Sequence, residues 1–212
     1  MTPDIRVLTH SSIRVESTAG VLYVDPYCVK GAPHDADFVF VTHEHFDHFS
    51  PEDIDKVRKD STVLIVPHNM YDKARDAMPE EVGITPAKPG FSYEVGGIKF
   101  ETVPAYNLVK PFHPKTAGWV GYVFSLDGQR IYVAGDTDAT DEARAVRCDV
   151  ALVPVGGTYT MDATRAAELV NAIRPSLAIP THYGSVTGTA EDAEIFRKRV
   201  DPGIPVDIRM EY

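Results

Sequence analysis

Three histidines and one aspartate fall within six consecutive positions, because residues 43–48 read His-Glu-His-Phe-Asp-His. Imidazole nitrogens and carboxylate oxygens are ligands that zinc, iron and manganese accept, and no thiolate is required. Side chains two positions apart in extended chain point the same way, so His43 and His45 can face one ion, with Asp47 and His48 close behind. Solvated histidines on an exposed loop are the alternative. Four ligand-type side chains at the end of an apolar segment favour a metal site.

This segment lies between a predicted strand and a predicted helix. The preceding residues 38–41 are apolar, as in a buried strand, and Ser50 and Pro51 supply an N-cap and a proline at the first helical position. Further helices are predicted from the N-cap Asp162 to just before Pro175, and from about residue 191 to residue 199. Strand-length apolar runs recur at residues 5–8, 21–24, 38–41, 63–66, 98–103, 120–126, 131–134, 150–155 and 177–179. The pattern predicts a single α/β domain over residues 1–212, with two sheets packed face to face and helices outside.

The two halves of the chain show a faint internal similarity. Residues 21–25 (Val-Leu-Tyr-Val-Asp) resemble residues 131–136 (Ile-Tyr-Val-Ala-Gly-Asp), and a second pair of strands follows at a similar offset. Chance similarity between apolar strands near acidic turns is the alternative. If the halves are related, Asp25 and Asp136 end equivalent strands on the same rim of the sandwich.

The composition is that of an ordinary globular protein, with 43% hydrophobic and 25% charged residues among 212. A formal net charge of −10 argues against nucleic acid or an anionic membrane surface as the main partner. No apolar run approaches the roughly 18–20 residues of a membrane span, and the first residues lack a signal pattern, so we expect a cytoplasmic protein. The two cysteines, Cys28 and Cys148, are too few for a disulfide framework, and we expect them to be small buried thiols.

The pattern His-x-His-x-Asp-His after a hydrophobic strand resembles the signature of the metallo-β-lactamase superfamily. Three later elements resemble the superfamily as well: Asp25 in Val-Asp-Pro, Asp136 in Ala-Gly-Asp-Thr-Asp, and His182 in Ile-Pro-Thr-His-Tyr-Gly. The fold that this resemblance implies is the four-layer αββα sandwich, in agreement with the strands and helices predicted above.

The resemblance also implies a role for each residue. His43 and His45 would bind a first metal ion, Asp47, His48 and His182 a second, and Asp136 would lie between the two. Asp25 would orient one of the ligand imidazoles. The cofactor implied is a pair of divalent ions, with zinc expected and manganese or iron possible, since mixed histidine and carboxylate sites accept several metals.

One ligand departs from the superfamily pattern. A histidine is expected at the end of the strand predicted over residues 98–103, but residues 103–107 read Val-Pro-Ala-Tyr-Asn. We predict that His113 reaches back from the following loop to complete the first site; Asn107 as a weak ligand, or a site with an open position, are the alternatives. His10, on the first predicted strand, resembles the Gly-His-Ser element of lactonase-like members and is expected near the metals without binding them, although a buried hydrogen-bonded histidine fits equally well.

Two bound ions would activate a water molecule and polarise a carbonyl or phosphoryl oxygen. Asp47 is predicted as the catalytic residue that holds the water and moves a proton. Substrate contacts are predicted from loops on the metal rim, at Tyr106, Asn107, Lys115, Thr158 and Tyr159, with a tight turn as the alternative for the last two.

The compact length and the elements around Asp25, Asp136 and His182 look most like those of ascorbate-6-phosphate lactonase-like members. This implies hydrolysis of a small-molecule lactone, ester or phosphodiester, in a chain that could form a homo-oligomer. The alternative is a metal-binding redox or sensing domain without hydrolytic turnover. Iron oxidoreductases of the superfamily typically carry glutamate in place of the second histidine of the motif, whereas this chain has His45.

Overall fold

The first sheet is formed entirely by the N-terminal part of the chain. The structure is a computed structural model that describes residues 2–211. The strands lie in sequence order, with β1 to β3 antiparallel and β3 to β6 parallel. The six strands are β1 (Asp4–Thr9), β2 (Ser12–Ser17), β3 (Gly20–Val24), β4 (Ala36–Phe40), β5 (Arg58–Pro67) and β6 (Gly83–Ala87).

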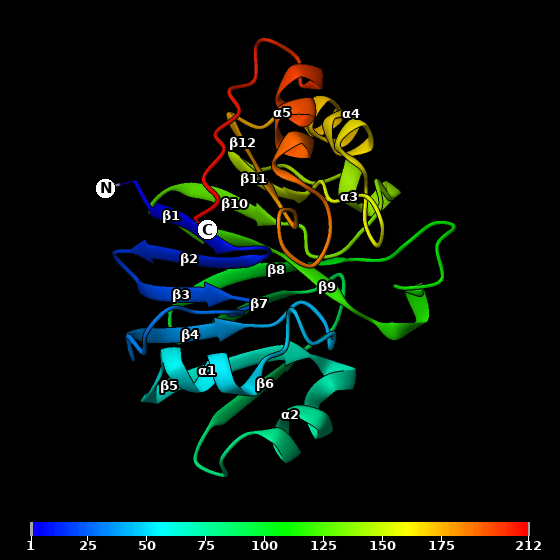
Figure 1. Cartoon of the computed structure of the whole chain (residues 1–212). Helices are drawn as coiled ribbons and strands as arrows, with labels where there is room; N and C mark the ends of the chain where they lie inside the picture. Colours follow the sequence, from blue (N-terminus) through cyan, green and yellow to red (C-terminus); the bar gives the residue numbers. More distant parts are fainter. Residues whose placement is uncertain (1, 212) are drawn as a thin grey trace.

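The second sheet repeats this arrangement with the rest of the chain (Figure 1). Its order is β12-β11-β10-β9-β8-β7, with β10 to β12 parallel and the other neighbours antiparallel. The strands are β7 (Ser92–Val95), β8 (Ile98–Pro104), β9 (Val120–Leu126), β10 (Gln129–Val133), β11 (Val150–Pro154) and β12 (Leu177–Thr181). In these two orders β3 corresponds to β10, and β4 to β11.

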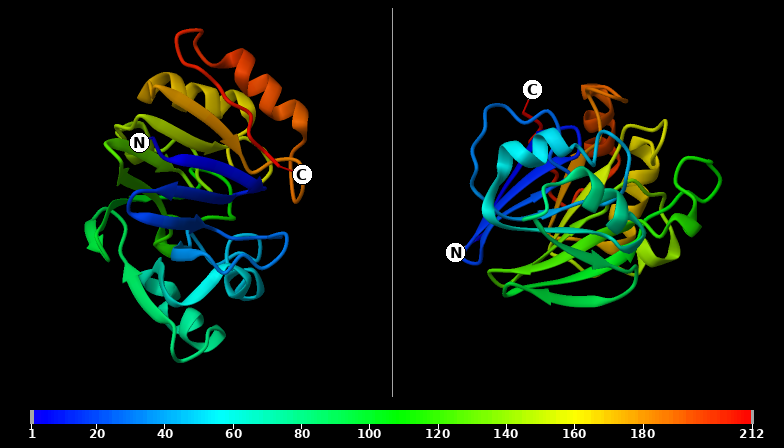
Figure 2. Two further views of the ribbon diagram at one scale, coloured as in Figure 1. Left: turned by 90° about the vertical axis from the view of Figure 1, so that its left-hand side faces the viewer. Right: turned by 90° about the horizontal axis from the view of Figure 1, so that it is seen from below.

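Three apolar clusters separate four layers. Phe40, Phe100 and Phe124 pack between the two sheets, with the rings of Phe40 and Phe124 4.7 Å apart. A second cluster joins the first sheet to helices α1 (Pro51–Val57) and α2 (Tyr71–Ala77). A third joins the second sheet to α4 (Ala163–Ile173) and α5 (Ala190–Arg199), while the short α3 (Asp141–Arg144) lies beside α4 (Figures 1 and 2). The predicted αββα sandwich is confirmed.

The predicted elements are present, and the predicted caps of α1 and α4 accept the expected backbone hydrogen bonds at Asp53 and Arg165. Three strands were not predicted: β2, β6 and β7. β2 carries arginine and glutamate between its apolar residues, β6 contains glycine and proline, and β7 is nowhere fully buried, so none of them has an apolar run. Their strand conformation comes from pairing with neighbours in the sheet.

Two predictions about single residues were wrong. The side chain of Cys28 is exposed in the loop after β3, and Cys148 is only partly buried. His10 does not lie on a strand, because β1 ends at Thr9 and His10 forms the turn to β2 with φ of 52°.

No helix within residues 2–211 is long and apolar enough to cross a membrane.

Candidate metal centre

The residues singled out from the sequence converge at one rim of the sandwich. β1, β3, β4, β8, β10, β11 and β12 run in one direction within their sheets, so their carboxyl ends meet at the same edge. The loops that leave these ends contain all the predicted ligands. Asp25 and Asp136 follow the equivalent strands β3 and β10, and both lie against His48, at 2.7 Å and 3.3 Å. The two carboxylates thus share one rim, as the internal similarity predicted.

The first group of donors contains three imidazoles. His43 Nε2 lies 3.0 Å from His45 Nδ1, and the ring of His113 is 5.0 Å from that of His43 and 4.9 Å from that of His45. One nitrogen from each ring falls within a space of 4.8 Å. Trp119 contacts all three rings and is itself buried. The loop after β8 therefore brings His113 to the position where the sequence lacks a strand-end histidine.

The second group is centred on the Asp47 carboxylate. Asp47 Oδ2 lies 3.1 Å from His10 Nε2, 3.5 Å from His48 Nε2 and 3.7 Å from His182 Nε2. All four side chains are buried or nearly so, and their donor atoms again fit within 4.8 Å. The sequence predicted His10 only near the metals. In the structure its Nε2 atom lies among the donor atoms of this group.

Asp136 lies between the two groups. Its Oδ2 is 3.2 Å from His113 Nε2 and 3.9 Å from His43 Nε2 on one side, and 3.1 Å from His182 Nε2 on the other. Its Oδ1 is 3.3 Å from His48 Nε2. A single carboxylate thus lies in contact with imidazoles of both groups.

The donor atoms fit divalent metal ions in chemistry as well as in position. Four of them are buried without a hydrogen-bond partner among the described residues: His48 Nε2, His113 Nε2, His182 Nε2 and Asp136 Oδ1. Buried polar atoms are rarely left unpaired, and each unpaired group costs about 1–3 kcal/mol. All four face the same small space. Metal ions coordinated in this space would give each of the four atoms a partner.

The ligand imidazoles are oriented by groups behind them. Asp25 accepts a hydrogen bond from His48 Nδ1 at 2.7 Å and is held by the backbone N–H and hydroxyl of Thr42. The same hydroxyl lies 3.0 Å from His43 Nδ1, and Asn107 Oδ1 lies 3.0 Å from His113 Nδ1. In each case the Nδ1 bond turns Nε2 toward the donor cluster. Thr42 was not predicted from the sequence as part of the site. The signal that could have indicated it is its hydroxyl-bearing side chain directly before the histidine-rich motif.

Burial and mutual charge set the protonation of the centre. Burial alone would raise the pKa of the Asp47 carboxyl, but the hydrogen bond with His10 and the neighbouring imidazoles of His182 and His48 hold that pKa far below its usual value. The pKa of Asp136 is likewise well below its usual value, because the charges of His182 and His48 outweigh burial. Burial lowers the pKa of His43 well below that of free histidine. Both carboxylates are therefore ionised, as metal ligation requires.

The backbone of the site departs from ordinary conformations. His10, Asp25 and His182 all have φ between 48° and 57°, a region that side-chain-bearing residues seldom adopt. Gly156 lies against the His182 turn, where a β-carbon would stand 2.2 Å from the His182 carbonyl oxygen. The loops are thus held in strained conformations by tight packing around them.

The predicted substrate residues border this rim. Tyr106 donates a hydrogen bond to Glu142, and Lys115 contacts both. Thr158 is exposed and Tyr159 partly buried. Asn107 is nearly buried: its carbonyl oxygen also accepts from the His113 backbone N–H, and its amide donates to the Tyr159 carbonyl. Contact between any of these residues and a substrate stays a prediction.

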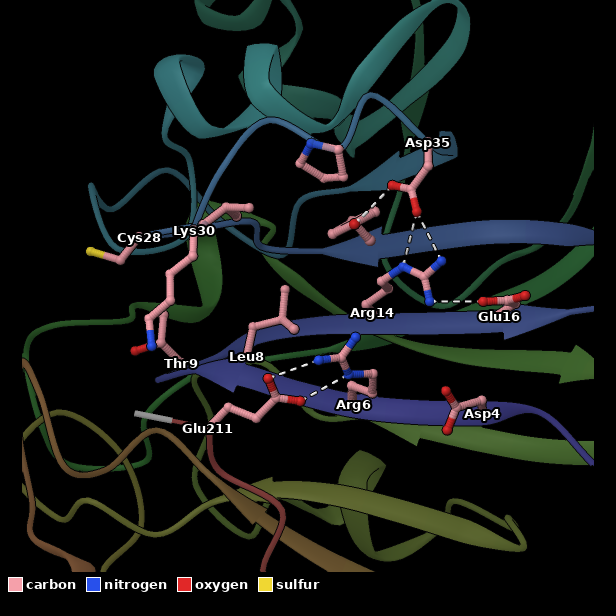
Figure 3. Close-up of a pocket in the computed structure, with 13 residues that line it drawn as sticks. Asp4, Arg6, Leu8, Thr9, Arg14, Glu16, Cys28, Lys30, Asp35 and Glu211 are labelled. Atoms are coloured by element: carbon pink, nitrogen blue, oxygen red, sulfur yellow. Dashed lines mark hydrogen bonds and ion pairs between the residues drawn. The ribbon is translucent and has the colours of Figure 1, made fainter.

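A cavity of about 560 Å³ lies over the outer face of the first sheet and contains none of the donor residues (Figure 3). Its arginines are neutralised by neighbouring carboxylates: Arg6 pairs with Glu211, and Arg14 with Asp35 and Glu16. The two arginines of the cavity therefore offer no unpaired positive charge to an anion.

Comparison with known proteins agrees with this geometry. A family model described as a beta-lactamase superfamily domain matches residues 4–182. A UPF0173 metal-dependent hydrolase of Thermococcus onnurineus is 32% identical over 211 residues, covering 92% of this chain and 91% of that protein.

Solved structures show the same fold. A protein from Parabacteroides distasonis, provisionally described as a metal-dependent hydrolase, is 30% identical with a TM-score of 0.80, over 98% of this chain and 92% of that one. The metallo hydrolase Igni18 of Ignicoccus hospitalis gives a TM-score of 0.81 at 23% identity, over 98% and 95% of the two chains. These similarities identify the chain as a metal-dependent hydrolase. It belongs to the metallo-β-lactamase superfamily.

Proposed function

We propose that this protein binds two divalent metal ions at the rim of the sandwich and hydrolyses a small-molecule lactone, ester or phosphodiester. The observation that carries the proposal is Asp136, whose carboxylate lies within 3.9 Å of imidazoles from both donor groups. A carboxylate shared in this way is typical of a binuclear centre.

The first ion would be held by His43, His45 and His113, and the second by Asp47, His48 and His182, with Asp136 between them. The ions, when bound, supply activation of a water molecule and polarisation of the bond under attack. Zinc suits the donor set, and manganese or iron also accept it. His10 supports the second group through its contact with Asp47.

Asp47 is the residue that we assign to proton transfer. Its carboxylate lies at the centre of the second donor group and is still about 5% exposed, so it can hold the attacking water and accept its proton. Passing that proton to the leaving group completes hydrolysis. His10, whose pKa burial lowers to about 4, stays neutral at physiological pH and holds the carboxylate in place.

The substrate would enter over the partly exposed His45 and contact the loops after β8 and β11. Tyr106, Lys115, Thr158 and Tyr159 offer hydroxyl and ammonium donors there. Asn107 contributes by holding the Tyr159 backbone and His113 together.

Metal analysis combined with turnover tests the proposal. Protein stripped with a chelator is reconstituted with zinc, manganese or iron, its metal content is measured, and a panel of lactones, carboxylic esters and phosphodiesters is assayed. We expect two ions per chain and metal-dependent hydrolysis of at least one class. Redox-active iron without turnover across the panel would support the redox or sensing alternative and reject the proposal.

A further inference from the structure

Exposed apolar side chains concentrate around the candidate metal centre. Six large hydrophobic residues of the described chain are exposed, and four of them lie on the two segments that also carry His45, Asp47 and His113. Single exposed hydrophobic residues are ordinary, whereas a group beside a site is a sign of binding. We call this group the apolar rim: Phe46 (65% exposed), Leu108 (59%), Val109 (91%) and Phe112 (41%).

The two aromatic members adjoin different ligand-bearing segments, since Phe46 lies between His45 and Asp47 and Phe112 directly precedes His113. The Phe46 ring packs edge-on against Tyr27 at 6.0 Å, and Tyr27 lies 6.4 Å from His10 of the second donor group. In the other segment, the Phe112 ring lies 4.9 Å from that of Tyr159. Each of the two segments that carry candidate ligands therefore also presents an exposed aromatic side chain.

The loop that carries the other members is firmly attached. It extends away from the body of the protein between β8 and β9 (Figures 1 and 2). The Leu108 N–H donates to Asp138, and the Lys110 ammonium donates to the carbonyls of Gly157 and Thr160. The Leu108 backbone and the Lys110 side chain are thus anchored on either side of Val109 in the sequence, while the side chains of Leu108 and Val109 are exposed. A ligand that covers them gains the free energy of removing apolar surface from water.

The cations near the rim are already engaged. Lys73 pairs with Glu44 at 2.8 Å, and Lys115 pairs with Glu142 at 2.7 Å. Lys110 is occupied by backbone carbonyls. Two arginines line a cavity together with Leu108 and Val109; Arg165 pairs with Glu168 at 3.0 Å, and Arg144 donates to the Ala139 carbonyl. The surroundings of the rim thus combine exposed apolar side chains with cations that already have polar partners.

From these observations we infer that the substrate is an uncharged carboxylic ester or lactone with an apolar acyl chain, which the apolar rim covers. This inference rests on the proposed hydrolytic function and narrows its substrate class. Full burial of a methylene is worth about fourfold in binding. On an open rim we expect roughly two- to threefold for each methylene, or about 16- to 80-fold between a four-carbon and an eight-carbon chain.

The test compares p-nitrophenyl butyrate with p-nitrophenyl octanoate on the metal-loaded protein. Phe46→Ser and Phe112→Ser should lower kcat/KM for the octanoate about tenfold more than they lower kcat/KM for the butyrate. Phe91→Ser is the matched control, because Phe91 is 58% exposed and lies between β6 and β7, outside the two segments that carry candidate ligands. A flat chain-length dependence, or an equal loss in Phe91→Ser, overturns the inference.

Binding of N-phenyl-1-naphthylamine to the metal-free protein gives a second measurement that needs no turnover. We expect its fluorescence enhancement to fall in the two rim variants and to persist in Phe91→Ser. If neither ester is hydrolysed, the inferred substrate class is wrong, the proposed function is decided separately by the lactone and phosphodiester panel, and the dye alone decides whether the rim binds apolar groups. Equal dye binding by the wild type, the two rim variants and Phe91→Ser would show that the apolar rim does not bind apolar groups.

Discussion

Replacing Asn107 by alanine should weaken metal binding although Asn107 is not in the ligand set. Its Oδ1 accepts hydrogen bonds from His113 Nδ1 at 3.0 Å and from the His113 backbone N–H at 3.1 Å. Both bonds are buried, and they turn His113 Nε2 toward Asp136. Loss of such an orienting partner typically lowers metal affinity about 10- to 100-fold, or about 1.4–2.7 kcal/mol. We expect a loss in this range for one of the two ions.

The same change should destabilise the metal-free protein. His113 is fully buried, so Asn107→Ala leaves two donors without a partner, each at a cost of about 1–3 kcal/mol. We expect the free energy of unfolding to fall by about 2–4 kcal/mol, because entering water can satisfy part of what is lost. Urea unfolding of chelator-treated protein measures this quantity.

Zinc affinity is measured by competition with a chromophoric chelator. Asn107→Asp keeps an acceptor for His113 and should recover most of the affinity. Asn171→Ala is the matched control, since Asn171 also bridges two backbone groups, at Arg199 and Asp201, but lies outside the site. Unchanged affinity for both ions in Asn107→Ala would refute the argument that the amide positions His113.

Three further predictions concern the centre itself. His113→Ala should reduce the zinc content from two ions per chain to one by elemental analysis, and a variant that keeps two ions excludes His113 as a ligand. Asp47→Asn, assayed at saturating zinc, should lower kcat about 100- to 10,000-fold, the usual contribution of a general acid–base residue, so activity near wild type removes that role. Gly156→Ala forces a β-carbon to 2.2 Å from the His182 carbonyl and should cost about 1–3 kcal/mol in thermal or urea unfolding. Gly83→Ala, where a β-carbon has no neighbour within 4 Å, is its control and should change little.

The sequence was most informative where local pattern and function coincide. The apolar strand β4, the histidine-rich segment and the N-cap Ser50 follow one another without interruption, so the loop and the helix after it could be predicted together. β6 and β7 could not be predicted in this way. Their residues have little strand preference of their own, and their conformation depends on pairing with β5 and β8.

The role of His113 could be predicted from the sequence only in part. Its residue type indicated a ligand, but its position depends on contacts between distant segments: Asn107 with Tyr159, and Lys110 with Gly157 and Thr160. None of these contacts has a periodic signature. The sequence therefore left open whether His113, Asn107 or neither completed the first site.

The loop after β8 joins two roles that the sequence analysis treated separately. It carries His113, and between Asn107 and His113 it also carries three of the four side chains of the apolar rim. A ligand that covers Leu108 and Phe112 therefore restricts the same loop that positions a metal ligand. If the rim binds an acyl chain, occupancy of the rim and affinity for the first ion should rise together, because each restricts a segment that the other needs ordered.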